Sequence, residues 1–425
     1  RGGRGGGGDG RGIDGPGGER RGSRGRGLAG DEVAEAMELC VGCKACKREC
    51  PAGVDMARMK AEVLHLRNRE CGVPLRERLF ASLPRLAPLA ARVPGLCNLR
   101  NRSRVLRWAG ERALGIAAER ELPEWHGRPF RDGELGEGGD GRGGGSCGVT
   151  DSVTDSPMNL SASGVAGGGE PRSEGPVTLF VDTFTRYFDP NVARAARDVL
   201  RGLGCDLVAA RASNRPRRPL CCGRTWIAAG LLDHARAELR RTLDALVPLV
   251  RRGFPIVGLE PSCLLTLRDE ALHLCPGEDA RLVAGHAFLA DEFLASRHAT
   301  PPVSTGARTE PDGAGSTVRI HGHCHQKAAG TEASTADALT ALLPGTVATP
   351  IRSSCCGMAG SFGYTAKHQR TSRGMGELGL FPALRAAPPS DVVVANGFSC
   401  RAQIRDGTGR RAQHLVEVLA GRIGG

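Results

Sequence analysis

The triplet Cys221-Cys222-Gly223 recurs as Cys355-Cys356-Gly357, and this repeat decides the fold that we expect. A Ser-Cys pair follows each triplet, in Glu260-Pro261-Ser262-Cys263 and in Gly397-Phe398-Ser399-Cys400. Each pair comes directly after a short apolar run, as expected where a buried strand ends. The shared order of these landmarks predicts an internal duplication.

The repeat extends upstream of the triplets. Residues 179–184 align with residues 320–325, which places Thr183 opposite Cys324. We therefore expect one domain over residues 177–296 and a second over residues 318–423. The Pro- and Gly-rich stretch 297–317 is predicted to link them.

Both halves alternate short apolar runs with helical periods. Strands are predicted at residues 179–181, 207–209, 256–259, 318–320, 347–348 and 392–395, and helices at residues 193–203, 227–250 and 333–343. This alternation indicates α/β units with a mainly parallel sheet. The expected fold is a pair of duplicated α/β domains preceded by a small helical domain.

The sharpest motif lies in that small domain, expected over residues 31–70. Cys40, Cys43, Cys46 and Cys50, followed by Pro51, have the C-x2-C-x2-C-x3-C-P spacing of bacterial ferredoxins. One loop of this spacing can wrap a [4Fe–4S] cluster, whereas zinc prefers two separated pairs. Cys50 either closes this cluster or serves a second one whose other ligands lie outside the chain.

Two helices are expected around this motif. Val33, Met37 and Leu39 indicate a short helix before it. After it, Asp55 can cap a helix. That helix should place Met56, Met59, Val63 and Leu66 on one face.

The triplet cysteines are predicted metal or cluster ligands, because adjacent cysteines form a disulfide only with strain. The second half supplies Cys324, Cys355, Cys356 and Cys400, while the first supplies Cys221, Cys222 and Cys263 beside Thr183. Such loops meet at the carboxyl ends of parallel strands. A reduced thiol site is the alternative.

Three histidines flank Cys324. On an alternating strand end, His321, His323 and His325 would share one face, where any could be a ligand or proton carrier. The remaining cysteines match no pattern and are interpreted as ordinary thiols: Cys71, Cys97, Cys147, Cys205 and Cys275. Lys327 and Glu377 are candidate charges of the site, although solvation at the surface is the expected account of both.

The excess of basic over acidic residues is confined to two stretches of the chain. The chain has 58 Lys+Arg and 46 Asp+Glu, a net +12. Residues 1–30, a Gly-rich stretch expected to be a disordered tail, carry seven Arg against three acids, and residues 66–130 carry thirteen against six. These stretches supply +4 and +7, so nucleic-acid binding across the whole protein is not expected.

The segments between domains follow from composition. Residues 71–130 are predicted to be a helical, basic connector, which either packs on neighbouring domains or contacts a membrane surface through Arg and Trp. Residues 131–176 are predicted to be a disordered linker. No apolar run is long enough to span a bilayer. The chain begins with Arg, so we expect a fragment or processed product, and targeting stays open.

Nucleotide-binding and catalytic motifs are missing from the sequence. We find no G-x-G-x-x-G after a strand, no Walker loop and no H-E-x-x-H. A flavin or nicotinamide site is therefore not expected in this chain.

The combination of motifs resembles a known family. Cys40–Pro51, the sequence 52–62 after it and the two CCG modules resemble the iron–sulfur portion of FAD-linked 2-hydroxyacid dehydrogenases of the D-lactate and glycolate type. They are also similar to the iron–sulfur subunits of glycolate oxidase and anaerobic glycerol-3-phosphate dehydrogenase, and the CCG modules to the heterodisulfide reductase B subunit. The resemblance covers residues 31–130 and 177–423.

The resemblance implies an FAD domain, on a missing segment or a partner chain, that oxidises a 2-hydroxyacid. Electrons would pass through the [4Fe–4S] cluster, and through a second iron–sulfur or metal centre in the CCG domains, to a quinone or cytochrome. It implies a cytoplasmic location, at the inner face of the membrane if the connector contacts lipid.

The chain departs from the family in two ways. Relatives carry two four-cysteine motifs and this chain has one. The family's CCG pattern ends in C-x2-C, but Glu260 and Gly397 occupy its first position here. Two other hypotheses stay open: a heterodisulfide-reductase-like thiol–disulfide redox protein, and a zinc- and RNA-binding protein that is not an enzyme.

Overall fold

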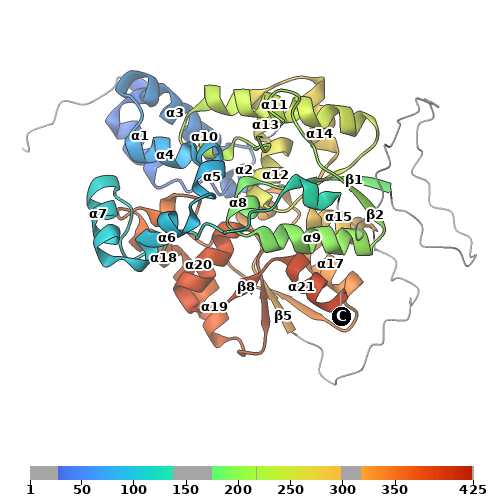
Figure 1. Ribbon diagram of the computed structural model, residues 1–425. Coiled ribbons are helices and arrows are strands. Elements are labelled where there is room, and N and C mark those ends of the chain that lie inside the picture. Colours follow the sequence, from blue (N-terminus) through green and yellow to red (C-terminus); the bar gives the residue numbers. More distant parts are fainter. Residues whose placement is uncertain (1–26, 137–174, 217, 298–316, 424–425) are drawn as a thin grey trace, which may run out of the picture.

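The computed structural model describes residues 27–136, 175–216, 218–297 and 317–423. N-terminal helices pack against two α/β halves, the first green to yellow and the second orange to red (Figure 1). Three predicted segments lie wholly or largely outside the described residues: the tail at 1–26, most of the 131–176 linker with Cys147, and residues 298–316.

Each half is built on a four-stranded parallel sheet. The first contains β1 (Gly175–Phe180), β2 (Cys205–Val208), β3 (Ile256–Gly258) and β4 (Ala287–Leu289) in the order β2-β1-β3-β4. The second contains β5 (Thr317–Ile320), β6 (Val347–Pro350), β7 (Val392–Val394) and β8 (Ala412–Gln413) in the order β6-β5-β7-β8. All pairs are parallel, so the predicted α/β class is confirmed.

Helices fill the space between the two sheets. These are α9 (Pro190–Gly202), α15 (Ala290–Arg297), α17 (Ser334–Leu342) and α21 (Leu415–Ile423). Val177 and Leu179 of β1 contribute to the same apolar core as Val318 and Ile320 of β5. Phe180 points to the opposite face, where a second core lies, because successive strand residues alternate between faces. The two halves therefore share one core.

The other helices cover the outer faces and the sheet ends: α8 (Thr183–Tyr187), α10 (Arg224–Ala228), α11 (Leu232–Arg251), α12 (Pro261–Arg268), α13 (Glu270–Leu274), α14 (Glu278–Gly285), α16 (Cys324–Ala329), α18 (Gln369–Glu377), α19 (Leu380–Ala386) and α20 (Phe398–Thr408). The single helix predicted over 227–250 is two helices, α10 and α11. Gly230 interrupts it at φ +69°, a backbone conformation that glycine adopts readily.

Gly230 also explains how the N-terminal unit docks. This unit contains α1 (Asp31–Glu38), α2 (Ala45–Glu49) and α3 (Met56–Cys71), and Asp55 caps α3 by accepting from Arg58 N at 3.1 Å. A Cβ at Gly230 would lie 2.4 Å from Leu64 Cβ, so α3 packs directly on this glycine.

The predicted apolar face of α3 is only partly used. Met59 is 47% exposed and Leu66 38% exposed, although Val63 is buried. The helix instead binds the first half through Asn68, whose side chain donates to Ala229 O at 2.8 Å, and through His65, 3.2 Å from Gly230 O. The close approach of α3 to the backbone at Gly230, and not the apolar periodicity of α3, therefore determines which face of the helix packs on the first half.

The connector forms α4 (Leu75–Ala81), α5 (Leu83–Ala90), α6 (Pro94–Arg102) and α7 (Arg104–Leu114). Large apolar side chains of this segment are exposed: Leu75, Leu79, Leu86, Leu89, Val93, Leu96, Leu99, Val105, Leu106 and Trp108. The chain after α7 packs on both halves, with Ala117 N donating to Tyr364 O and Phe130 N to Arg186 O. The described helices include none with the length and hydrophobicity needed to cross a bilayer.

The first residues of the predicted linker are ordered. Asp132–Leu135 form a short 3-10 helix with Leu135 buried. Arg194 of α9 binds Glu134 at 2.9 Å, and Arg201 donates to Leu135 O at 2.7 Å. Polar residues on the outer face of α9 therefore hold this segment against the first half.

His414, directly before α21, joins the halves and should make stability depend on pH. Its Nε2 lies 3.0 Å from Leu259 O, and burial, followed by the charge of Arg401, lowers the pKa of His414 to about 3. The unfolded state takes up a proton below about pH 6.5 and the folded state does not, so stability falls as the pH drops from 6.5 towards 3. From pH 7 to pH 5 the unmodified chain should lose about 2 kcal/mol more than His414→Gln in urea unfolding. All other titrating groups are common to both proteins, and parallel pH curves would contradict this role.

Candidate functional site

The second-half cysteines meet at the carboxyl edge of the second sheet. Cys324 begins α16 after β5, and Cys400 lies in the first turn of α20 after β7. Cys355 and Cys356 follow β6. The chain passes from β5 to β6 on one side and returns to β7 on the other, which is the switch point where α/β proteins bind ligands.

These four thiols form a continuous row. Hydrogen bonds join Cys324 to Cys355, Cys355 to Cys356, and Cys356 to Cys400. The neighbouring Cys324 and Cys356 thiols, with Gly357 N at 3.4 Å, lower the pKa of Cys355. The Cys356 thiol likewise lowers the pKa of Cys400.

The other two members of the row have the opposite shift. The hydrogen bond to Cys355, then burial, raises the pKa of Cys324. Hydrogen bonds to Cys355 and Cys400, then burial, raise the pKa of Cys356. Protons are therefore shared along the row, and the donors needed for a metal lie together.

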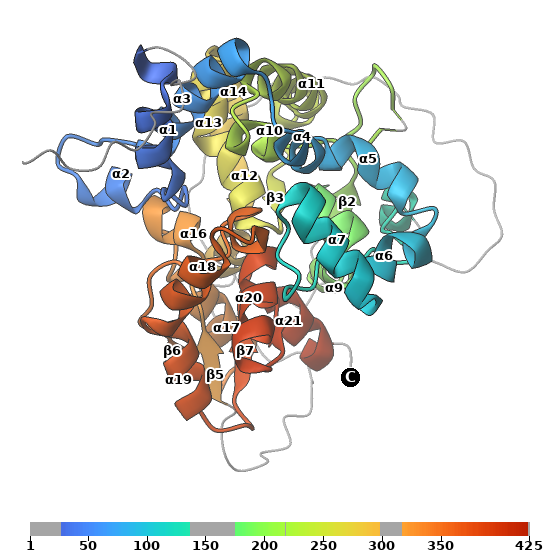
Figure 2. The same ribbon diagram turned by 90° about the vertical axis from the view of Figure 1, so that its left-hand side faces the viewer.

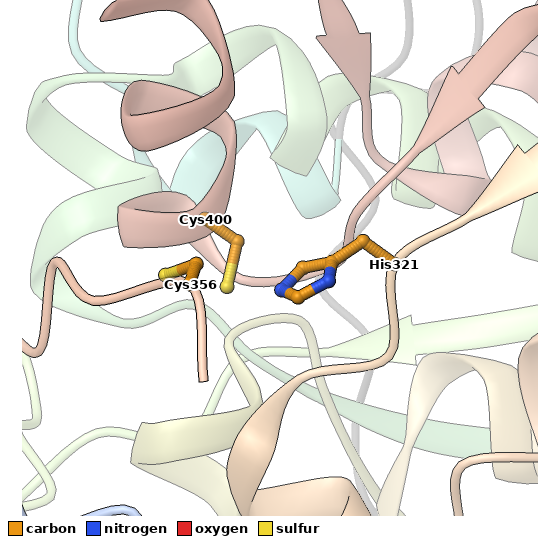
Figure 3. A group of neighbouring side chains, drawn as sticks. All are labelled: His321, Cys356 and Cys400. Carbon is orange, nitrogen blue, oxygen red and sulfur yellow. The ribbon is translucent and has the colours of Figure 1, made fainter. Parts of the chain in front are cut away.

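His321 completes one end of this row (Figure 3). Its ring nitrogen and the sulfurs of Cys356 and Cys400 all lie within 4.8 Å of one another, and all three residues are buried. Nδ1 lies 2.9 Å from Ser353 Oγ, and the ring also helps to lower the pKa of Cys400 through its charge and a hydrogen bond. Among the described residues, Nε2 has no polar partner other than this sulfur.

The three histidines do not share a face, contrary to expectation. β5 ends at Ile320 and α16 begins at Cys324, so the strand alternation stops before it reaches them. His323 caps α16 by accepting from His325 N at 3.1 Å, and its Nε2 lies 3.9 Å from Glu260 Oε1. His325 reaches the N-terminal unit instead, 3.1 Å from Gly42 O. Burial, then the charge of Arg224, lowers the pKa of His325, so this ring is neutral.

The first-half cysteines border an apolar core, as Cys356 and Cys400 do, but Phe180 stands where the second half has His321. Cys222 and Cys263 belong to an apolar core that includes Phe180. Although the Cys222 thiol opposes the shift, burial raises the pKa of Cys263 to about 12. The Cys222 hydrogen bond and burial raise the pKa of Cys221. These three thiols lie together but remain protonated near neutral pH, and metal binding there stays a prediction.

The four-cysteine loop aims backbone N–H groups at its sulfurs. Met56 N lies 3.4 Å from Cys46 Sγ, and the N–H groups of Val54, Ala52 and Gly53 lower the pKa of Cys50. Burial raises the pKa of Cys43. Backbone donors of this kind stabilise iron–sulfur clusters, so the donor set and its hydrogen bonds fit a cubane.

The loop is tightly anchored. Gly42 and Lys44 have φ of +64° and +62°, and a non-glycine residue in this region is strained. Buried Lys44 offsets this through ion pairs with Asp269 and with Glu270, the latter at 2.8 Å. The loop is therefore held against the first half.

One cavity of about 960 Å³ brings the two cysteine groups together. Its lining includes Cys40 together with Cys324, Cys355, Cys356 and Cys400. Gly42 O accepts from Arg224 at 3.4 Å, and α2 packs on α16. Figure 2 shows α2 beside α16 where the N-terminal unit meets the second half. The loop thus lies between the two halves.

Sequence reasoning missed several residues of this region. Arg224 contacts the loop at Gly42 O, and Lys44 within the loop pairs with Glu270. The only available signal for either residue was its proximity to a cysteine motif. Lys327 is not a solvated surface charge, because it is half-buried and its Nζ donates to Ser353 O. Glu377 is exposed, as expected, and pairs with Arg385 at 2.8 Å. All fifteen described cysteines are free, including Cys71, Cys97, Cys205 and Cys275.

Comparisons with known proteins agree with the resemblance to FAD-linked dehydrogenases. The chain is 27% identical over 388 residues to the D-2-hydroxyglutarate dehydrogenase of Escherichia coli strain K12, which covers 91% of the chain and 34% of that protein. The corresponding dehydrogenase of Pantoea ananatis is 24% identical over 393 residues with the same coverage. One component of the anaerobic glycerol-3-phosphate dehydrogenase of E. coli K12 is 26% identical over 247 residues, which are 57% of the chain and 58% of that component.

No protein-family model matches the chain. It spans about a third of the length of the D-2-hydroxyglutarate dehydrogenases that it matches. The chain is therefore similar to one part of these dehydrogenases and to one component of a multi-subunit dehydrogenase.

Proposed function

We propose that this chain is the iron–sulfur electron-transfer module of an FAD-linked 2-hydroxyacid dehydrogenase. The observation that carries the proposal is the position of the four-cysteine loop, which shares a cavity with the second-half cysteines. A [4Fe–4S] cluster held by Cys40, Cys43, Cys46 and Cys50 would supply one-electron chemistry there. A second metal or iron–sulfur centre would be held by the second-half cysteines. The similarity to D-2-hydroxyglutarate dehydrogenases supports a substrate of that class.

The flavin is assigned to a further domain or a partner chain. The matched part of the relatives is only a third of their length, which supports this division. The module would deliver electrons to a quinone or cytochrome. The two α/β halves, with the same strand order, are proposed to be the duplicated CCG domains.

Helices α4–α7 are proposed to contact the inner face of an anionic membrane. Exposed leucines and Trp108 alternate there with arginines, the pattern of a segment that lies on a bilayer surface. Binding to anionic but not neutral vesicles tests this contact.

Anaerobic purification with metal and sulfide analysis tests the electron-transfer proposal. We expect about four irons and four sulfides per chain bound at the loop, with an EPR signal that appears on reduction by dithionite. Zinc without sulfide would overturn electron transfer and favour a metal-stabilised binding protein.

A further inference from the structure

The second half contains a compact donor set that is distinct from the four-cysteine loop. We propose that His321 Nε2, Cys356 Sγ and Cys400 Sγ bind a single divalent ion of the zinc class. The fourth coordination position would face the cavity that Cys356 and Cys400 line. The proposal specifies the metal and the ligands of the second centre in the proposed function. It rests on that function only because both use the same cysteines.

The imidazole of His321 provides the first argument. The residue is only 2% exposed, and among the described residues its Nε2 atom has no polar partner other than the Cys400 sulfur. Ser353 Oγ, 2.9 Å from Nδ1, can accept the Nδ1 proton, which leaves the lone pair on Nε2 directed towards the two sulfurs. Metal-bound histidines are oriented by such a hydrogen bond on the opposite nitrogen.

The first half provides an internal comparison. Phe180 occupies the position that aligns with His321, and it packs in an apolar core with Cys222 and Cys263. The cysteines thus occur in both halves, but the imidazole occurs only beside Cys356 and Cys400. Both pairs of cysteines border an apolar core, so the imidazole, and not the packing of the sulfurs, distinguishes the second half as a ligand site.

The space around Gly397 argues against a cluster bound by thiolates alone. Gly397 stands where the family's C-x2-C pattern has its first cysteine. A Cβ built there would lie 2.4 Å from His323 Cδ2 and 3.1 Å from Cys400 Sγ. The ring of His323 therefore occupies the place of that additional thiolate.

The donors that remain suit a single ion. Two thiolates and an imidazole are typical zinc ligands, and three protein ligands with an open fourth position characterise a reactive rather than a structural site. Soft sulfur and borderline nitrogen donors select zinc over magnesium or calcium. Cys355, hydrogen-bonded to Cys356, is the next thiol along the cavity wall.

Cobalt titration of the reduced, metal-stripped full chain tests the site. The unmodified chain should bind one Co²⁺ at this site with a thiolate-to-cobalt charge-transfer band and the intense visible bands of a tetrahedral ion. His321→Ala should abolish the part of the spectrum that arises from this site, whereas cobalt taken up by the four-cysteine loop should persist in His321→Ala and be weakened by Cys43→Ser. Ser353→Ala, which removes only the orienting hydrogen bond, should weaken binding 10- to 100-fold.

Matched variants separate this site from the others. Cys222→Ser should leave the cobalt spectrum unchanged, because the first half lacks the imidazole. Cys43→Ser should remove the iron and sulfide of the loop and leave the cobalt site at His321 intact. Failure of the electron-transfer proposal can therefore be distinguished from failure of the zinc-site proposal. An unmodified chain without the cobalt spectrum, or full affinity in both His321→Ala and Ser353→Ala, would overturn the proposal. Sulfide-bound iron that Cys356→Ser removes would also overturn it, in favour of a cluster.

Discussion

Replacing Cys43 with Ser is expected to remove about four irons and four sulfides per chain together with the EPR signal of the reduced protein. Cys43 is the second ligand of the loop and lies near Cys355, whose charge acts on it. Burial raises the pKa of Cys43, so without a cluster this residue is a neutral thiol. Cluster binding must therefore release its proton, and reconstitution with iron and sulfide should become more favourable as the pH rises.

Cys71→Ser is the matched control for this change. Cys71 ends α3, is exposed and matches no ligand pattern, so its replacement should leave iron, sulfide and the EPR signal unchanged. Retention of four irons and the same signal in Cys43→Ser would show that the iron is bound elsewhere, and the assignment to the loop would be wrong.

Replacing Gly357 with Ala is expected to destabilise the chain by about 2–5 kcal/mol, because two unfavourable effects combine. Gly357 has φ +90°, where a side chain is strained. A Cβ would also lie 2.2 Å from Ser372 O, so α18 would have to move. Gly357 N donates to Cys355 Sγ, and the same movement should disturb the row of thiols.

Gly223→Ala is the internal control, because Gly223 is the aligned residue of the first triplet. Its φ is +78°, but the nearest backbone oxygen, of Ala235, would lie 3.3 Å from the new Cβ. This variant keeps the conformational strain without the severe clash and should cost about 1–2 kcal/mol. Urea unfolding of the two variants measures the difference. Equal losses would show that positive φ alone controls both positions.

Much of the fold could be predicted because it is local. The six predicted apolar runs each overlap a strand, since β-branched residues flanked by turns mark buried strands. β4 and β8 were missed because, unlike the comparably short β3 and β7, they contain no β-branched residue. The way in which α3 packs could not be predicted, because Gly230 on another element allows a close approach that the periodicity of α3 does not record.

The sequence by itself determined the four-cysteine loop and the order of the two repeats. The loop ligands lie within one short segment, so their spacing alone specifies the geometry that they can adopt. Only the tertiary structure decided which triplet faces the cavity. Both pairs of cysteines border an apolar core, but only Cys356 and Cys400 also line the cavity and meet His321. The physical reason is that sheet order and interdomain packing, which no local spacing encodes, determine whether a buried sulfur has an apolar or a polar neighbour.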